Sequence, residues 1–357
     1  DNGFPDMFAK PILDTFRRIP WREGSAFVFA DLVDEHGSPL AVNPREVLKR
    51  VLRRYEDKGY RPLVGSELEF YLFDSEKKPV FDGIQCYSLY RGAELEYVIG
   101  EMRNGIEGLG IELEAFHIEY GPGQIEVIPE YGDALKMADN TVLIKNSIKE
   151  IARKHGLYAS FMPKPWEQES GNGYHVHQSL WDANLEINYF NEDKSIADSY
   201  LAGLVKHARD FMVLGAPTIN DYKRFKPNSF APTNATWAHD NRTVSTRSLL
   251  GLGNGSRFEQ RNGSAAANPY LIIAASLASG LDGIENRLVP PEDHEKEAPQ
   301  FPKTLDSALD YFEASALARE FFGEEFVKLF ITLGRHEVEL YNSAITDWEW
   351  NRYFEMV

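Results

Sequence analysis

Short stretches of alternating polar and apolar residues recur along the chain and predict strands that carry one polar face each. In a strand, residues two apart point to the same side. The pairs that share a face are Glu67 with Glu69, Gln124 with Glu126, His175 with His177, and Glu259 with Arg261. The pattern therefore predicts a sheet whose polar face is a binding surface, suited to divalent metal and phosphate.

Longer segments follow helical spacing, and the first of them has clear start signals. Asn43 supplies a capping side chain, Pro44 occupies the first helical position, and the pattern stops near Gly59. Further helices are predicted at about 92–109, 133–155, 195–213 and 264–285, with two or three more at the end of the chain. Strands are predicted at 25–31, 63–73, from Ile111, from Gln124, at 158–163 and at 174–181. The segment 215–256 is rich in loops. Strands separated by helices, with turn-linked strands between them, indicate the α+β class.

Composition narrows the class of protein. With 357 residues, 43% of them hydrophobic, the chain can bury the core of one large domain. A net charge of −17 argues against nucleic acid or an anionic membrane as a partner. The single cysteine, Cys86, excludes an intrachain disulfide, and the first residues show no signal-peptide pattern. We therefore expect a soluble, cytoplasmic protein.

Six side chains on the predicted polar face could hold metal. They are Glu67, Glu69, Glu119, Glu126, His175 and Glu259. Oxygen ligands with one imidazole suit Mg²⁺ or Mn²⁺ better than a structural zinc. Six ligands can divide into two three-ligand sites, and two close cations commonly clamp a phosphoryl group during transfer. The alternative, solvated charges on edge strands, is weakened because the pattern recurs on several strands beside Gly-rich turns.

Arginines form a second group, within one loop-rich stretch. They are Arg224, Arg242, Arg247, Arg257 and Arg261. A guanidinium binds carboxylate and phosphate oxygens with two parallel hydrogen bonds. Five arginines around a glutamate-rich face favour an anionic substrate together with the phosphates of a nucleotide.

The motifs resemble the glutamine synthetase family over nearly the whole chain. The matching segments, in order, are 65–74 (GSELEFYLFD), 119–126 (EYGPGQIE), 173–181 (GYHVHQSLW), 240–243 (DNRT), 257–261 (RFEQR) and 265–271 (AAANPYL). The resemblance implies a glutamine-synthetase-like catalytic domain at 42–357, with a curved antiparallel sheet flanked by helices. Residues 1–41 would be part of a small N-terminal β-grasp domain. It also implies a homo-oligomer of stacked hexameric rings, a dodecamer.

The same resemblance implies a role for each matching residue. One metal falls to Glu69, Glu119 and Glu126, and the other to Glu67, His175 and Glu259. Arg224, Arg261 and Gly171 would hold glutamate, beside Ser170, which stands where the family usually has asparagine. ATP would be bound by Glu114, His177, Ser179, Arg242, Arg247 and Arg257. We assign Arg242, Glu259 and Phe230 to catalysis.

One departure from the family bears on the nucleophile. In the segment 222–232, Phe230 stands where the resemblance places a glutamate of ammonia-using enzymes. An aromatic ring offers an apolar wall or a π face but no carboxylate for ammonium. The sequences SFAP (229–232) and WAHDNRT (237–243) are similar to those of the γ-glutamyl polyamine, alkylamide and anilide synthetase branch. Polyamines would need acidic residues near the entrance, whereas alkyl or aryl amines would need walls such as Phe225, Phe230 and Trp237.

The sequence therefore predicts an ATP-dependent ligase that joins the γ-carboxylate of glutamate to a primary amine through a γ-glutamyl phosphate. Two alternatives stay open. In the first, Phe230 only packs the segment around it, and the chain is an ammonia-using glutamine synthetase. In the second, the chain is a non-catalytic structural or regulatory relative.

Overall fold

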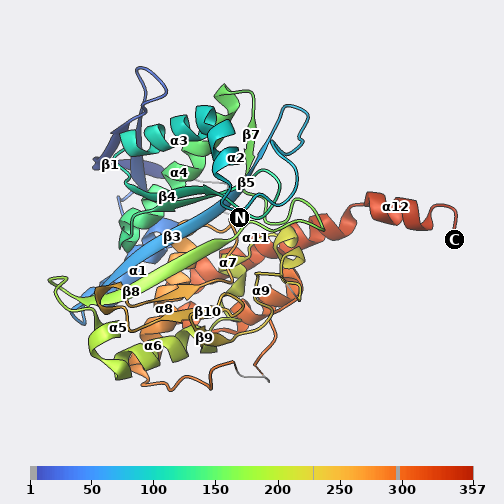
Figure 1. Ribbon diagram of the computed structural model, residues 1–357. Helices are drawn as coiled ribbons and strands as arrows, with labels where there is room; N and C mark the ends of the chain where they lie inside the picture. The colour runs from blue at the N-terminus through green and yellow to red at the C-terminus, as the bar shows by residue number, and fades with distance from the viewer. Residues whose placement is uncertain (1–5, 228, 295–297, 357) are drawn as a thin grey trace.

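The computed structural model describes residues 6–227, 229–294 and 298–356, and a nine-stranded sheet lies at its centre (Figure 1). Its main path runs in the order β4 (Leu113–Ile118), β5 (Gln124–Pro129), β3 (Tyr60–Phe73), β8 (Tyr174–Asp182), β11 (Arg257–Gln260), β10 (Thr246–Leu249) and β9 (Trp237–His239). Two short strands, β6 (Gly132–Asp133) and β7 (Tyr158–Ser160), also pair with β3. Neighbouring strands are antiparallel except β9 and β10, which are parallel. The sheet is therefore antiparallel as expected except at this edge, where the parallel pair makes it mixed.

Helices cover the apolar face of this sheet. They are α1 (Pro44–Glu56), α4 (Ala134–Lys154) and α8 (Pro269–Glu285), with α6 (Lys194–Lys206) packed on α8. Leu68 and Phe70 of β3 are fully buried in one core with Val47 of α1. Glu67 and Glu69 alternate with them and point to the opposite, polar face. The predicted α+β class and the two-faced sheet are confirmed.

Predicted helices agree with the structure best where caps are clear. The Asn43 side chain accepts a hydrogen bond from the Arg45 backbone N–H at 3.1 Å, and α1 starts at Pro44 as expected. The predicted helix 264–285 starts later, at Pro269, because the side chain of Asn268 caps its first turn. Two predicted helices are each split: the first into α2 (Leu89–Glu94) and α3 (Glu96–Gly108), the second into α6 and α7 (Met212–Gly215). A short α5 (Tyr189–Glu192) precedes α6.

The loop-rich segment 215–256 holds more regular structure than the sequence indicates. It contains β9, β10 and the 3₁₀ turns η1 (Ile219–Lys223) and η2 (Gly253–Gly255). Strand β10 begins Thr246-Arg247-Ser248 and lacks the apolar alternation that identifies a strand. Asn228 in this segment, and 295–297 in the Pro/Glu-rich connection that follows α8, lie outside the described residues, as do residues 1–5.

Four helices, rather than two or three, end the described chain. They are α9 (Leu305–Ala314), α10 (Ala316–Phe322), α11 (Glu324–Ser343) and α12 (Asp347–Tyr353). Figure 1 shows α11 leaving the body of the molecule and α12 extending beyond it. Among the described residues, no helix is both long and apolar enough to cross a membrane.

The N-terminal strands form a separate two-stranded sheet of β1 (Phe8–Arg18) and β2 (Ala26–Val33). A buried arginine of α1 fastens this sheet to the helices. Arg45 donates to Asp31 of β2 at 3.1 Å and to both carboxylate oxygens of Asp139 in α4 at 3.0 Å. The assignment of 1–41 to part of a β-grasp domain stays a prediction.

Candidate active site

Strand register brings the predicted metal-binding side chains together across the sheet. Glu67 of β3 lies opposite His175 of β8, and Glu69 lies opposite Glu126 of β5. On the other side of β8, His177 lies opposite Glu259 of β11. Residues directly opposite each other on one face approach closely enough for their side chains to meet. Four strands that are far apart in sequence therefore build a single polar surface.

At one end of this surface, Glu67 links two histidines. Its two carboxylate oxygens lie 3.0 Å from His175 Nδ1 and 2.8 Å from His177 Nε2. Burial by itself would raise the pKa of Glu67, but the hydrogen bonds from His175 and His177 outweigh burial and hold the pKa far below its usual range. Glu67 is therefore ionised at this point of the sheet.

Glu259 lies next to this group and is completely buried. Its Oε1 is 3.5 Å from His175 Nδ1 and also accepts from Arg261, whereas its Oε2 accepts from Arg247 at 3.0 Å. Burial opposes ionisation, yet the positive charges of His175 and Arg261 lower the pKa of Glu259 below its usual value. The predicted second metal set, Glu67, His175 and Glu259, is thus contiguous in space.

At the other end, Glu69 and Glu126 are two acidic groups that face each other across β3 and β5. Burial, together with the nearby charge of Glu119, raises the pKa of Glu69 to about 7. Burial and the charge of Glu69 raise the pKa of Glu126 to about 7, against a hydrogen bond from His117. A buried carboxylate next to a partly buried one, with repulsion between them, is a site that a cation would stabilise. The donor set therefore fits a divalent ion.

His117 also belongs to this group, and the sequence analysis did not include it. Its Nε2 lies 2.9 Å from a Glu126 oxygen and 3.3 Å from a Glu119 oxygen. The hydrogen bonds to Glu119 and Glu126 raise the pKa of His117 to about 9. A signal was present, because His117 lies two residues before Glu119 and so shares its face of the chain. Among the described residues, three sets of ligand atoms lie close enough to hold an ion: His117 with Glu119 and Glu126; Glu67 with Glu126 and His175; Glu67 with His177 and Glu259.

A cavity of about 900 Å³ opens over this surface. It is lined by five of the six predicted metal ligands, all except Glu259, and by Ser170, Gly171, Arg224, Phe230, Arg242 and Arg261. Arg224 is buried: one nitrogen donates to the Gly263 carbonyl at 3.0 Å, and its Nε has no partner in the described structure. A Cβ on Gly171 would lie 2.6 Å from Arg224 Cγ, so only glycine fits there. The residues expected at glutamate thus line one wall.

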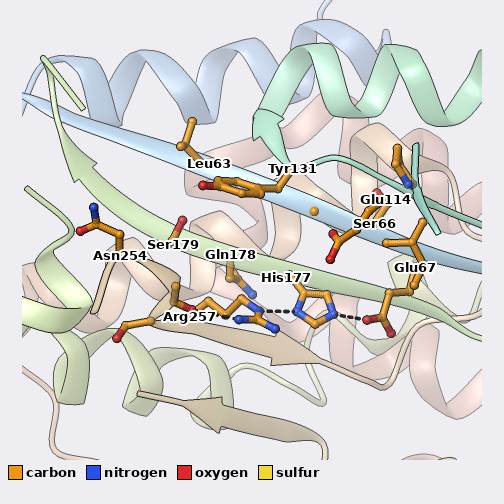
Figure 2. A pocket seen from close by; sticks show the side chains of 15 residues that line it. Leu63, Ser66, Glu67, Glu114, Tyr131, His177, Gln178, Ser179, Asn254 and Arg257 are labelled. Atoms are coloured by element: carbon orange, nitrogen blue, oxygen red, sulfur yellow. Dashed lines mark hydrogen bonds and ion pairs between the residues drawn. The ribbon is translucent and has the colours of Figure 1, made fainter. Parts of the chain in front are cut away.

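A second cavity of about 300 Å³ also has Glu67 in its lining (Figure 2). It is lined by the predicted nucleotide-side residues Glu114, His177, Ser179 and Arg257, and also by Leu63, Tyr131 and Asn254, which the sequence analysis missed. Figure 2 shows a chain of contacts in which Arg257 Nε donates to His177 Nδ1 at 3.1 Å and His177 contacts Glu67. Glu67 therefore lines both cavities.

Two other predicted nucleotide-side arginines do not line this second cavity. Arg247 pairs with Glu259 and with Asp240, and Arg242 lines the larger cavity, where its carbonyl accepts from Arg261 Nε at 3.2 Å. Two of the three aromatic walls expected for an amine are also absent from the larger cavity. Phe225 packs near Phe301, and Trp237 donates to the Pro291 carbonyl at 2.8 Å. Only Phe230 of those three lines it.

The chain belongs to the glutamine synthetase family, because residues 41–353 match the model of the glutamine synthetase catalytic domain. It is 37% identical to a glutamate–isopropylamine ligase of a Pseudomonas species, covering 100% of this chain and 83% of that protein. It is 38% identical to the gamma-glutamylethanolamide synthetase GlnA4 of Streptomyces coelicolor, covering 99% and 80%. A glutamine synthetase of Methanococcus voltae is 34% identical, covering 98% and 83%. Among solved structures, GmaS without ligand is similar, with a TM-score of 0.92 and 32% identity over 99% of this chain and 86% of that one.

Proposed function

We propose that this chain is an ATP-dependent ligase that joins the γ-carboxylate of glutamate to a primary amine through a γ-glutamyl phosphate. The observation that carries the proposal is the pair of cavities that share Glu67. One has the residues expected for a nucleotide, and the other has buried arginines and Phe230. Relatives named for isopropylamine and ethanolamide products support an organic amine as the nucleophile.

We propose that Mg²⁺ or Mn²⁺ is held by Glu67, Glu69, Glu119, Glu126, His175 and Glu259, with His117 supporting Glu119 and Glu126. Bound there, divalent ions would supply Lewis-acid neutralisation of phosphate charge. Formation of an acyl phosphate brings two anions together, and side chains of this protein must counter both. Arg224 and Arg261 face the glutamate end, where Ser170 and Gly171 close the wall, and Arg242 faces the same cavity.

On the nucleotide side, Glu114, His177, Ser179 and Arg257 line the smaller cavity and would bind ATP. Arg247 would act indirectly, because its hydrogen bond to Glu259 fixes the position of that carboxylate. Arg261 would do the same from the glutamate side. The contacts from Arg247 and Arg261 fix the Glu259 carboxylate. Fixed positions around the reacting groups are the main way such a site lowers the barrier to phosphoryl transfer.

The decisive test is phosphate release with ATP, glutamate, Mg²⁺ or Mn²⁺ and a panel that includes ammonia and several organic amines. We expect amine-dependent phosphate release and a γ-glutamyl amide, seen by mass spectrometry. Turnover with ammonia that organic amines do not change would establish the ammonia-using alternative. An intact assembly without turnover on any amine would establish the non-catalytic one.

Two variants test the ligand assignment. Glu126→Ala and His175→Ala should each lower phosphate release by on the order of 100-fold or more, because an uncompensated ligand loss disrupts ion binding. Glu107→Ala, which removes an exposed carboxylate of α3, is a control outside both cavities. Retained turnover in the two ligand variants would contradict the assignment.

We further propose a homo-oligomer of stacked hexameric rings, a dodecamer in the cytoplasm. Large apolar side chains are exposed on the last two helices and in the residues next to α12, and they support a contact between subunits; they include Leu333, Leu340, Ile345, Trp348, Trp350 and Phe354. Molecular mass in solution tests the assembly.

A further inference from the structure

Two aromatic rings meet at the outer part of the larger cavity. The ring centroids of Tyr120 and Phe230 lie 5.4 Å apart, at an interplanar angle of 59°. Tyr120 closely follows β4, whereas Phe230 comes from the distant segment 222–232, so the tertiary fold alone brings them together. Tyr120 is 42% exposed and Phe230 55% exposed, and both line the cavity. Part of the apolar surface of both rings is therefore exposed at this cavity.

This pair is attached directly to the acidic surface. The Tyr120 backbone N–H donates to a Glu119 oxygen at 3.1 Å, and Glu119 lines the same cavity as the Tyr120 ring. Tyr87 adds a third ring from another segment, with its centroid 5.1 Å from that of His117, and it lines the same cavity. A molecule lying along this wall would therefore have its nitrogen near Glu119 and its carbon atoms against aromatic faces.

We propose that Tyr120 and Phe230, with Tyr87, bind the organic part of the amine, and that the preferred nucleophiles are primary monoamines with a compact apolar group. This inference rests on the ligase activity proposed above. Aromatic faces attract both an ammonium group and apolar carbon atoms. Ammonia has no carbon atoms to contact the wall, so it would gain least from it.

The charges at the outer part of the cavity argue against diamines and polyamines. A second ammonium group would need net negative charge beyond the aromatic wall. The Glu167 carboxylate lies 3.7 Å from Lys226 Nζ, and Lys164 Nζ donates to the carbonyl of Glu169. All four residues line the cavity, so the two lysine charges equal the two carboxylate charges in number, although in the described part of the chain only Lys226 of the two pairs with a carboxylate. A distal positive charge would meet no net negative surface among the described residues.

The test compares Tyr120→Ala, Tyr120→Phe and Tyr87→Asn with the unchanged protein. Asparagine is chosen at position 87 because φ is 57° there and asparagine tolerates that conformation. The matched control is Tyr97→Ala, which removes a half-exposed tyrosine that also packs on a histidine but lies outside both cavities. For each protein, kcat and KM are measured by phosphate release with isopropylamine, benzylamine, putrescine and ammonia, together with the molecular mass.

We expect the unchanged protein to have a higher kcat/KM for isopropylamine or benzylamine than for putrescine or ammonia. Tyr120→Ala should lower kcat/KM for the two apolar monoamines by about 3- to 10-fold, mainly through KM, with a smaller loss for ammonia. Tyr120→Phe should retain most of the preference, because it keeps the ring. Tyr87→Asn should change selectivity in the same direction as Tyr120→Ala, and Tyr97→Ala should leave it unchanged.

The outcomes separate this inference from the proposed function. No phosphate release with any amine would overturn the ligase proposal itself. Turnover with organic amines in which Tyr120→Ala lowers all substrates equally would overturn only the amine-binding role of the wall. A preference for putrescine would overturn the charge argument and hence the monoamine class. A change in molecular mass with unchanged selectivity would show that the wall is a contact between subunits.

Discussion

The surroundings of Glu69 and Glu126 disfavour the ionised form of both carboxyl groups when no cation is bound. Burial raises both pKa values to about 7, together with the charge of Glu119 at Glu69 and the charge of Glu69 at Glu126. Glu67, only two residues from Glu69, has the opposite shift because two histidines bind it. The difference shows that neighbours across the sheet, rather than residue type, set the charge at each position.

The raised pKa values predict a pH dependence of ion binding. Below about pH 7, Glu69 and Glu126 hold protons that must leave before a cation binds ionised carboxylates. Mn²⁺ affinity should therefore fall as the pH drops below about 7, by up to about tenfold per pH unit for each proton released, and level off above it. Calorimetric titration in buffers of different ionisation enthalpy would count these protons. Affinity that stays constant between about pH 6 and pH 8 would contradict the expectation.

Phe230 allows a second prediction at the scale of one residue. Phe230→Glu places a carboxylate at the cavity and removes a ring from the wall. We expect the ratio of kcat/KM for ammonia to that for isopropylamine to rise by about tenfold, since ammonium gains a charged partner and the larger amine loses a contact. Phe230→Leu is the matched control, because it removes the ring without adding charge. An unchanged or lower ratio in Phe230→Glu would show that Phe230 does not select the nucleophile.

At the scale of elements, the site depends on how closely the loops approach the strands. The turn between β4 and β5 packs against β3 so tightly that a Cβ on Gly121 would lie 1.9 Å from the Tyr71 hydroxyl oxygen. Gly171 approaches Arg224 in the same way, and a Cβ there would also lie 2.7 Å from the Pro163 carbonyl oxygen. Gln124 joins the two regions, because its Nε2 donates to the Gly171 carbonyl at 3.1 Å. These contacts fix the part of the cavity wall that holds Arg224 against the carboxylates of the predicted metal site.

We therefore predict that Gly171→Ala displaces Arg224. The substitution should destabilise the protein by about 1–3 kcal/mol, the usual cost of overpacking, and raise KM for glutamate more than KM for ATP. Thermal unfolding and steady-state kinetics would measure the two effects. Gly92→Ala is the control, because a Cβ at that helical position meets nothing within 4 Å. Equal effects of both substitutions would argue against the close approach at Gly171.

At the scale of the whole molecule, Arg45 connects the N-terminal sheet to the helices beneath the main sheet. It is buried, and its partners Asp31 and Asp139 come from β2 and α4. Burial alone would raise the pKa of Asp31, but Lys49 and Arg45 outweigh burial and lower it. This ionised partner stabilises the fold above the unfolded-state pKa of Asp31, and the contribution is lost as the pH falls through the lower, folded-state value.

Removal of this connection should be costly. Arg45→Ala leaves the Asp139 carboxylate without its charged partner, and we expect a loss of about 3–5 kcal/mol in the free energy of unfolding. Arg45→Ala combined with Asp139→Asn should recover part of it. Arg53→Ala removes a half-exposed arginine paired with Glu46 and should cost at most about 1 kcal/mol. Denaturant unfolding at fixed protein concentration would measure all three, and a small effect of Arg45→Ala would contradict the proposed connection.

The exposed apolar end of the chain gives a prediction about assembly. A chain ending at Ser343 would lose α12 and the exposed Ile345, Trp348 and Trp350. We expect its oligomer to be smaller or to dissociate at higher protein concentration, because those side chains would no longer bury apolar surface between subunits. Mass photometry would measure the shift, and Val289→Ser, which changes an exposed apolar residue elsewhere, is the control. An unchanged mass would contradict this role.

The amino-acid sequence by itself determined which side chains share a face. A strand repeats every two residues, so Glu67 with Glu69 and His175 with His177 could be paired without a structure. Caps such as Asn43 likewise defined helix starts, because they act through adjacent backbone groups. The family and the reaction class also followed from such local motifs.

Tertiary structure alone decided which faces meet. Strand order and register placed Glu69 against Glu126, brought His117 to Glu126, and set Tyr131 in the smaller cavity. It also paired Tyr120 with Phe230 and removed Phe225 and Trp237 from the amine wall. The physical reason is that local spacing fixes the direction of a side chain, whereas its neighbours depend on which distant segments pack beside it.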